Sequence, residues 1–151
     1  MLVILDSILN RIIANRKKGK QTFVFIDEIY ILFMHEYSAQ FLFKLWKRVR
    51  KYGAYCTGLT QNVEDLLQSH TARTMLSNSE FIIMLNQAAT DRDELAKLLN
   101  ISDQQISFIK NVSAGCGLIK VGSSLVPFEN NFPKNTKLYR LMTTKPNDDF
   151  R

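Results

Sequence analysis

The order of strand-like and helix-like segments predicts an α/β protein with an open sheet. Short apolar runs rich in β-branched and aromatic residues occur at 22–26, 54–59 and 81–85, and helical patterns over 38–52 and 63–78 separate them. The run at 22–26 is continuous, which is typical of a strand buried on both faces of a parallel sheet. With 151 residues, 46% of them hydrophobic, and a net charge of +6, we expect one globular domain with a moderately basic surface.

Helices are expected on either side of this central part. Residues 2–17 place apolar side chains at helical spacing. Two further helices are expected at about 91–99 and 103–111, and the alternation over 117–128 around a Gly-Ser-Ser turn predicts a β-hairpin. The polar residues 146–151 are expected to form a loose tail.

Several classes of protein are excluded by composition. Cys56 and Cys116 are too few for a disulfide framework or a four-cysteine zinc site, and His35 and His70 form no close ligand pair. Charged residues interrupt the longest apolar run, at 23–34, well short of a membrane span. These features predict a cytoplasmic protein with reduced thiols.

The strongest chemical signal is the pair Asp27-Glu28, which directly follows the apolar run Phe23–Ile26. Open α/β sheets bind ligands at the carboxyl ends of their strands. In P-loop ATPases the first acid at this position holds Mg²⁺ on the β- and γ-phosphates, and the second orients the attacking water. Taken alone, the pair is equally consistent with acids that simply end and solubilise a strand.

Other polar residues add to this signal. Gln61 follows the strand at 54–59, where an amide can hydrogen-bond a phosphate oxygen or the attacking water. Arg50 and Arg73 are two candidates for an arginine that stabilises transition-state charge on a neighbouring subunit's γ-phosphate, and spacing does not choose between them. The nearby basic stripe is expected to be a solvated helix face, and consists of Lys44, Lys47, Arg48 and Lys51.

Taken together, these stretches resemble the VirB4 family of conjugation and type IV secretion ATPases, and more loosely the HerA- and FtsK-like DNA pumps. The resemblance covers nearly all of residues 1–145. It rests on FVFIDE (23–28), which is similar to a Walker B motif, and on three longer blocks: RKYGAYCTGLTQNVEDLL (50–67), TMLSNSEFIIMLNQAATDRDEL (74–95) and GLIKVGSSLVPFENNFPK (117–134), the last similar to proteins of Gram-positive conjugative elements such as conjugative transposons.

The resemblance implies a fold and a set of roles. It implies part of a RecA-like P-loop NTPase sheet, mostly parallel and flanked by helices, with ATP and Mg²⁺ as cofactors. Asp27 would lie on the Mg²⁺ side, Glu28 at the attacking water and Gln61 at the γ-phosphate. Arg50 and Arg73 would be trans-acting or phosphate-contacting arginines.

One departure from the family pattern is important. The sequence has no Gly-x-x-x-x-Gly-Lys-[Ser/Thr], the Walker A loop that cradles phosphates. We therefore expect residues 1–145 to be the C-terminal part of an ATPase motor domain. By itself the chain is expected to be inactive and to bind no nucleotide tightly.

The resemblance also implies partners. The intact motor would be a homo-oligomer, hexameric in arrangement, that works with membrane secretion-channel proteins at the inner face of the cell membrane. DNA contact would be independent of sequence. In the fold that the resemblance implies, the P-loop strand lies between the strands at 54–59 and 81–85, and this strand is missing here. Its absence leaves unpaired strand edges, so we expect either direct pairing of 54–59 with 81–85 or a strand-mediated dimer.

A different class of function is represented by residues 91–111, which scan as a helix-turn-helix. A DNA-binding regulator would need donors and cations on the second helix, but residues 103–111 carry one Asp and one Lys. Two packed helices are the simpler interpretation. A non-catalytic role in the assembly of a larger complex is a third possible function.

Overall fold

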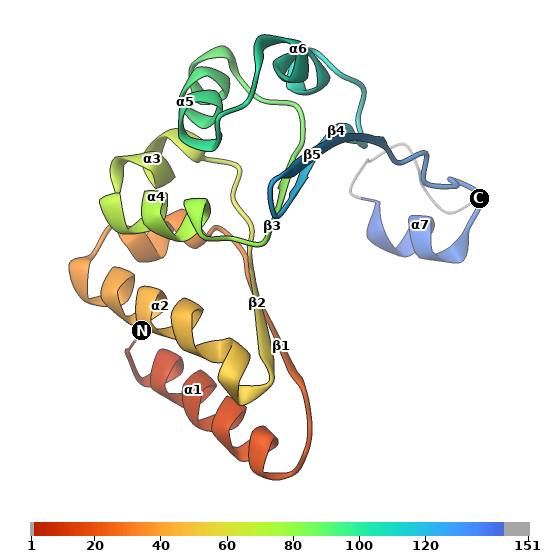
Figure 1. Ribbon diagram of the computed structural model, residues 1–151. Coiled ribbons are helices and arrows are strands. Elements are labelled where there is room, and N and C mark those ends of the chain that lie inside the picture. Colours follow the sequence, from red (N-terminus) through yellow and green to blue (C-terminus); the bar gives the residue numbers. More distant parts are fainter. Residues whose placement is uncertain (1, 144–151) are drawn as a thin grey trace. The chain divides into compact units, whose positions relative to one another are not determined.

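The computed structural model describes residues 2–143, so the tail expected at 146–151 lies outside the described residues. The chain divides into two compact units (Figure 1). Unit 1 contains the residues up to Ser79 together with Asp93–Asn100, and unit 2 contains Glu80–Arg92 and the residues from Ile101 onward. Each unit is described by itself.

Unit 1 is built on a two-stranded parallel sheet. β1 (Thr22–Ile26) pairs with β2 (Ala54–Gly58) in the register Thr22↔Ala54 through Ile26↔Gly58. The strands are parallel because the chain crosses back between them through a helix, as in other α/β folds. The helical elements are α1 (Leu2–Lys17), the 3₁₀-helix η1 (Ile29–Phe33), α2 (Glu36–Arg48), the 3₁₀-helix η2 (Val49–Tyr52), α3 (Val63–Gln68) and α4 (His70–Ser77).

Helices α1 and α2 pack against one face of this sheet. Val24, Ala54 and Cys56 on that face contact the buried side chains Ile12 and Leu45. A second cluster lies between α2, η1, α3 and α4, and its buried members are Ile29, Leu42, Leu66, Ala72 and Met75. The amphipathic pattern of α2 is confirmed, because its apolar side enters both clusters.

The opposite face of the sheet is open. Phe23, Phe25 and Tyr55 are 61%, 71% and 53% exposed, and the rings of Phe23 and Tyr55 stack at 5.1 Å. The expectation that 22–26 is buried on both faces is therefore wrong. The side chains alternate in burial because, within unit 1, the described helices cover the Val24 side only.

Unit 2 contains a three-stranded antiparallel sheet in the order β3-β4-β5, formed by β3 (Phe81–Met84), β4 (Cys116–Val121) and β5 (Ser124–Glu129). The predicted hairpin over 117–128 is confirmed. The direct pairing expected between 54–59 and 81–85 is not formed, because β3 pairs with β4 and β2 pairs with β1.

The helices differ from the sequence pattern at their ends. Residues 63–78, which were expected to contain one helix, form two. Ser69 has an extended backbone, and its side chain accepts a hydrogen bond from the Ala72 amide, which starts α4. α5 (Ala89–Leu99) forms as expected and runs across both units. The helix expected over 103–111 is one α-helical turn, α6 (Asp103–Ile106), followed by the 3₁₀-helix η3 (Ser107–Ile109), and α7 (Lys137–Met142) was not expected.

Among the described residues, none of the helices combines the length and the hydropathy that a membrane crossing requires.

Candidate functional site

Asp27 and Glu28 form a tight turn at the carboxyl end of β1. Glu28 adopts a left-handed backbone conformation, with φ 47° and ψ 48°, and its amide donates to Oδ1 of Asp27 at 3.0 Å. This conformation costs roughly 1–2 kcal/mol for a residue other than glycine. Such strain is concentrated at functional sites, so the turn itself indicates a functional role for the pair.

The Glu28 carboxylate is held in an unusual environment. Its Oε2 atom is buried and has no hydrogen-bond partner among the described residues, whereas Asp27 is exposed. A buried carboxylate oxygen without a donor costs free energy. Oε2 of Glu28 is therefore suited to accept a hydrogen bond from a water molecule that enters with a substrate.

The acid turn is attached to the end of β2. The Leu59 amide donates to the Ile26 carbonyl at 2.8 Å, and the Ile29 amide donates to the Leu59 carbonyl at 2.9 Å. Gly58 packs closely against Ile29, since a Cβ at position 58 would lie 2.6 Å from Ile29 Cδ1. A side chain at position 58 would push on the residue that follows Glu28.

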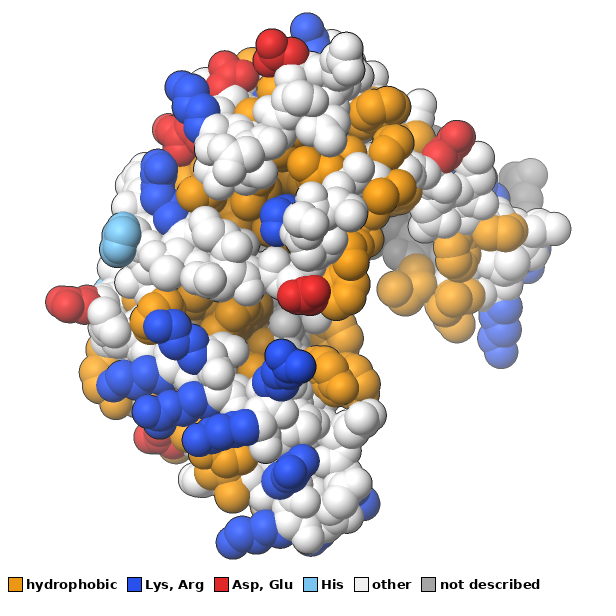
Figure 2. All heavy atoms as spheres, in the orientation of Figure 1, with side chains coloured by type: hydrophobic (Ala, Val, Ile, Leu, Met, Phe, Trp, Pro, Cys, Tyr) orange, Lys and Arg blue, Asp and Glu red, His pale blue; other side chains and the backbone are white. Residues whose placement is uncertain are grey.

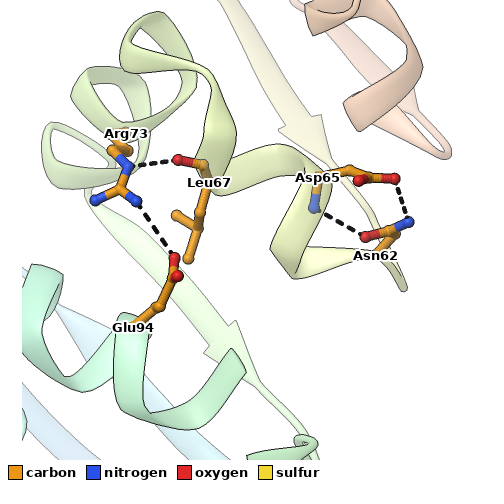
Figure 3. Close-up of polar contacts among 5 residues, drawn as sticks. All are labelled: Asn62, Asp65, Leu67, Arg73 and Glu94. Carbon is orange, nitrogen blue, oxygen red and sulfur yellow. Dashed lines mark hydrogen bonds and ion pairs between the residues drawn. The ribbon is translucent and has the colours of Figure 1, made fainter. Parts of the chain in front are cut away.

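Gln61 lies at the same edge as the acids. It is exposed and follows Leu59 by two residues, just before α3 begins. Its position is set by the neighbouring Asn62, whose Oδ1 accepts the Asp65 amide at 3.0 Å and whose Nδ2 donates to Asp65 Oδ2 at 2.6 Å (Figure 3). The structure thus brings Asp27, Glu28 and Gln61 to one edge of the sheet, as predicted.

Arg50 lies at the opposite end of the same sheet. It is in η2, where its carbonyl accepts the Gly53 amide, and the Gly53 carbonyl in turn accepts the amide of Thr22, the first residue of β1. The length of β1 separates it from the acid pair, about 13 Å at 3.3 Å per residue. Within one chain the structure does not bring Arg50 to the site.

Arg73 is already engaged in contacts inside unit 1. Its Nε donates to the Leu67 carbonyl near the end of α3, and its Nη2 lies 3.3 Å from Glu94 Oε2 on α5 (Figure 3). Both side chains are about half exposed. Exposed ion pairs contribute little to stability, so the carbonyl contact that joins α4 to α3 is the stronger of the two.

The basic stripe on α2 and η2 is solvent-facing, as expected. Lys44, Lys47, Arg48 and Lys51 are all exposed. Val49 is buried in the cluster with Ala54, and Trp46 packs partly buried against the second cluster.

The donor set at the acid turn fits Mg²⁺ bound through phosphates. Within the residues that the structure describes, no group of three or more His, Cys, Asp or Glu side chains could form a metal cage. Mg²⁺ keeps most of its waters and is usually bound by one or two carboxylates together with substrate phosphates. The exposed Asp27 carboxylate supplies that kind of ligand.

Two features of the site were missed by sequence reasoning. The Asn62–Asp65 cap and the close Gly58–Ile29 contact both position site residues. Asn followed three residues later by an acid, just before an apolar run, is a helix-start pattern that the sequence already contains. The contact of Gly58 with Ile29 depends on the path of the chain after Glu28 and has no local signal.

The remaining candidate chemistry is weaker. Burial raises the pKa of the Cys56 thiol to about 11, so it stays protonated at neutral pH and is a poor nucleophile. The helix-turn-helix interpretation lacks a recognition helix, because α6 has four residues and is followed by a 3₁₀ turn.

Comparisons with known proteins match this chain to one family model and to one solved fold. The model of a family described as the TraG P-loop domain matches residues 1–116. Among solved structures, the chain is similar to VirB4 of Thermoanaerobacter pseudethanolicus, with a TM-score of 0.69 and 24% sequence identity, over 75% of this chain. The chain spans about a third of that protein, 32% of its length. Among curated proteins, none matches.

Proposed function

This chain belongs to the TraG P-loop domain family and shares the fold of VirB4, and from this premise we propose that it supplies the part of an ATP-hydrolysing site that handles the metal and the attacking water. The observation that carries the proposal is Glu28: at the carboxyl end of β1 it has a strained backbone and a buried carboxylate oxygen that has no hydrogen-bond partner within residues 2–143.

The residues at this edge take distinct roles. When bound, Mg-ATP supplies the γ-phosphoryl group and the metal that neutralises its charge. The exposed carboxylate of Asp27 would be a ligand of that metal. Glu28 accepts a hydrogen bond from the attacking water at Oε2 and holds its proton as general base. The amide of Gln61 donates to a phosphate oxygen.

An arginine from a neighbouring subunit completes the arrangement. Arg50 lies at the far end of the sheet from its own acid pair and is exposed, so it is available only to another chain. Arg73 is held by the Leu67 carbonyl and Glu94. We therefore assign the trans-acting role to Arg50 and a structural role to Arg73. An arginine in this role contributes on the order of 10³–10⁵ to the rate.

The wider setting is part of the same proposal. The intact motor is an oligomer, hexameric by the family pattern, that powers type IV secretion in conjugation and works at the inner face of the membrane with the proteins of the channel. The phosphate-binding loop is absent from this sequence, so the chain alone hydrolyses no ATP and binds Mg-ATP no tighter than about millimolar.

The experiment compares Asp27→Asn with wild type in the intact motor. We expect binding of Mg-ATP to weaken, while binding of ATP in EDTA stays unchanged, because Asp27 acts through the metal. Glu64→Gln, an exposed acid of the neighbouring helix α3, is the matched control and should leave both affinities unchanged. Equal Mg-ATP affinities for Asp27→Asn and wild type would contradict the assignment, as would micromolar Mg-ATP binding by the isolated chain.

A further inference from the structure

The strands of the β1–β2 sheet and the segments that follow them carry no cation that could lie beside a phosphate. Residues 22–35 and 53–69 contain no Lys or Arg, and Figure 2 shows Lys and Arg side chains gathered over α1 and α2 instead. The phosphate contact at this edge therefore depends on the neutral amide of Gln61. A hydrogen bond from an amide weakens steeply beyond about 3.2 Å and with misalignment, whereas a cation acts over a longer range. The position of Gln61 has to be fixed closely.

Thr60 closes a small ring around Gln61. The Thr60 hydroxyl accepts a hydrogen bond from the Asn62 amide and donates one to the Asn62 carbonyl, both at 3.1 Å. A hydroxyl has one proton and two lone pairs, so it can make both bonds at once. Thr60 and Asn62 are both partly buried. Because the residues on either side of Gln61 are joined in this way, the backbone of Gln61 has little freedom to rotate.

The ring is anchored at both of its ends. On one side, Leu59 is hydrogen-bonded through its amide and its carbonyl to the two residues that flank the acid pair, at 2.8 and 2.9 Å. On the other side, the Asn62 side chain caps α3. The hydroxyl of Thr60 joins these two anchors, and so it links the position of Gln61 to that of the acid turn.

The place of Thr60 in the fold makes its side chain important. It lies after the end of β2 at Gly58 and before the start of α3 at Val63, so neither a strand ladder nor a helix holds its backbone. Thr74 on α4 is different, because its hydroxyl donates to the His70 carbonyl at 3.0 Å, four residues earlier in its own helix. There the helix already fixes the backbone, and the side-chain bond adds little.

We propose that Thr60 is a positioning residue for ATP hydrolysis, which acts through Gln61 by holding its backbone beside the acid turn. This inference rests on the γ-phosphate role of Gln61 in the proposed function. No atom of Thr60 needs to touch the nucleotide. The effect of losing its hydroxyl falls on the rate rather than on binding, since misplacing a positioned group by about 1 Å costs on the order of a hundredfold in rate.

The first test measures ATP hydrolysis by the intact motor. Thr60→Val keeps the branched shape and removes the hydroxyl, and we expect kcat to fall by about tenfold to a hundredfold while KM changes less than about twofold. Thr60→Ser keeps the hydroxyl and should restore most of the rate. Thr74→Val, which also removes a hydroxyl bonded to a backbone carbonyl, is the matched control and should hydrolyse ATP as wild type does. Equal losses in the two valine variants, or no rescue by serine, would overturn the proposal.

A double variant separates this proposal from the proposed function. If Thr60 acts through Gln61, then Gln61→Ala alone and Thr60→Val/Gln61→Ala should have the same kcat. A further loss in the double variant would overturn the role of Thr60 and leave that of Gln61 intact. Hydrolysis at the wild-type rate in Gln61→Ala would instead overturn the assignment of Gln61 in the proposed function, and the role of Thr60 with it.

Amide hydrogen exchange of the full chain, without nucleotide, tests the contact itself. The Asn62 amide should exchange about fivefold faster in Thr60→Val than in wild type, as for the loss of one neutral hydrogen bond, and Thr60→Ser should reverse the change. The Leu59 amide, whose acceptor is the Ile26 carbonyl, should be unchanged in both variants. Equal exchange of Asn62 in wild type and Thr60→Val would overturn the proposal even if the variant motor fails to assemble.

Discussion

The two ends of the β1–β2 sheet share the same strands but differ in almost every property. At the carboxyl end, the backbone of Glu28 is strained, and its buried Oε2 has no partner in the part of the chain that the structure describes. Hydrogen bonds through Leu59 join this turn to β2. At the amino end, the side chains are exposed cations on helix ends and a turn. Hydrogen bonds therefore hold the turn at the carboxyl end in one geometry, whereas the amino end is characterised by exposed positive charge.

The difference follows from the topology. Parallel strands with helical crossovers place the loops that follow the strands at one edge, where ligands bind. The helices that lead into the strands end at the other edge. Cations are favoured near helix C-termini, where the helix dipole is negative. The exposed cations at the amino end therefore lie where the helix dipole favours them, whereas the strained turn at Glu28 must be held by its surroundings.

The first prediction tests whether the amino end of one subunit's sheet, where Arg50 lies, meets the carboxyl end of its neighbour's sheet, where Glu28 lies. Motors built from Glu28→Gln subunits alone or from Arg50→Ala subunits alone should lose hydrolysis by about 10³-fold. Mixing the two should restore a measurable rate, because some interfaces then pair an intact Glu28 with an intact Arg50. A mixture of Glu28→Gln and Arg73→Ala subunits should hydrolyse ATP no faster than the average of the two separate motors. If the mixture with Arg50→Ala does not recover ATP hydrolysis, the trans-acting arginine is not Arg50.

The second prediction compares the glycines at the two ends of β2. Gly58→Ala should destabilise the chain by about 1–2 kcal/mol in urea unfolding, since the new Cβ overlaps Ile29. Gly53→Ala should cost about 1 kcal/mol for another reason, its φ of 64°, because the new Cβ makes only ordinary van der Waals contact with the Arg16 side chain, at 3.5 Å. Amide exchange at Ile29 and Leu59 should accelerate in Gly58→Ala and stay unchanged in Gly53→Ala. Identical exchange in both variants would argue against the contact.

The third prediction concerns strain at the acid turn. Glu28→Gly should raise the free energy of unfolding by about 0.5–1 kcal/mol, because glycine adopts φ 47° without penalty and the buried oxygen is removed. Asn100→Gly, at φ 54°, is the control and should change little, since asparagine tolerates this conformation. A loss of stability in Glu28→Gly would mean that the glutamate holds the turn rather than straining it.

The last prediction concerns Cys56, which lies between the two ends on the covered face of the sheet. Burial raises its pKa from 9.0 to about 11, so its protonated form stabilises the fold fully below pH 9. That contribution is lost as pH rises from 9 to 11. The melting temperature of wild type, relative to Cys56→Ala, should therefore fall over this range. A difference independent of pH would mean that the thiol is not buried as described.

Much of the fold was predictable from local patterns. The helix at 2–17, both strands of the parallel pair and the hairpin follow from periodicity and turn residues. The open face of β1 was not predictable, because a continuous apolar run such as TFVFI is compatible with a strand buried on one face and with a strand buried on both. The pairing of β3 with β4 depends on which edge each strand meets, and this is a long-range property.

The candidate site was predictable in composition but not in geometry. The order Asp27-Glu28 after a strand and Gln61 after the next places the three residues at one edge by topology alone. The positive φ of Glu28 has no local signal, since asparagine, aspartate and glycine are the residues that usually adopt it. The separation of Arg50 from the acids, and the contacts that hold Arg73, required the folded chain.

The central claim is that Glu28 acts on the attacking water and contributes nothing to holding the nucleotide. The measurement that tests it most directly is ATP hydrolysis and ATP binding by the intact motor carrying Glu28→Gln, with Glu64→Gln as the control on an exposed acid of α3. We predict that hydrolysis falls by at least about a hundredfold in Glu28→Gln, while the Kd for Mg-ATP stays within about twofold. Hydrolysis at the wild-type rate, or a loss explained entirely by weaker binding, would contradict the claim.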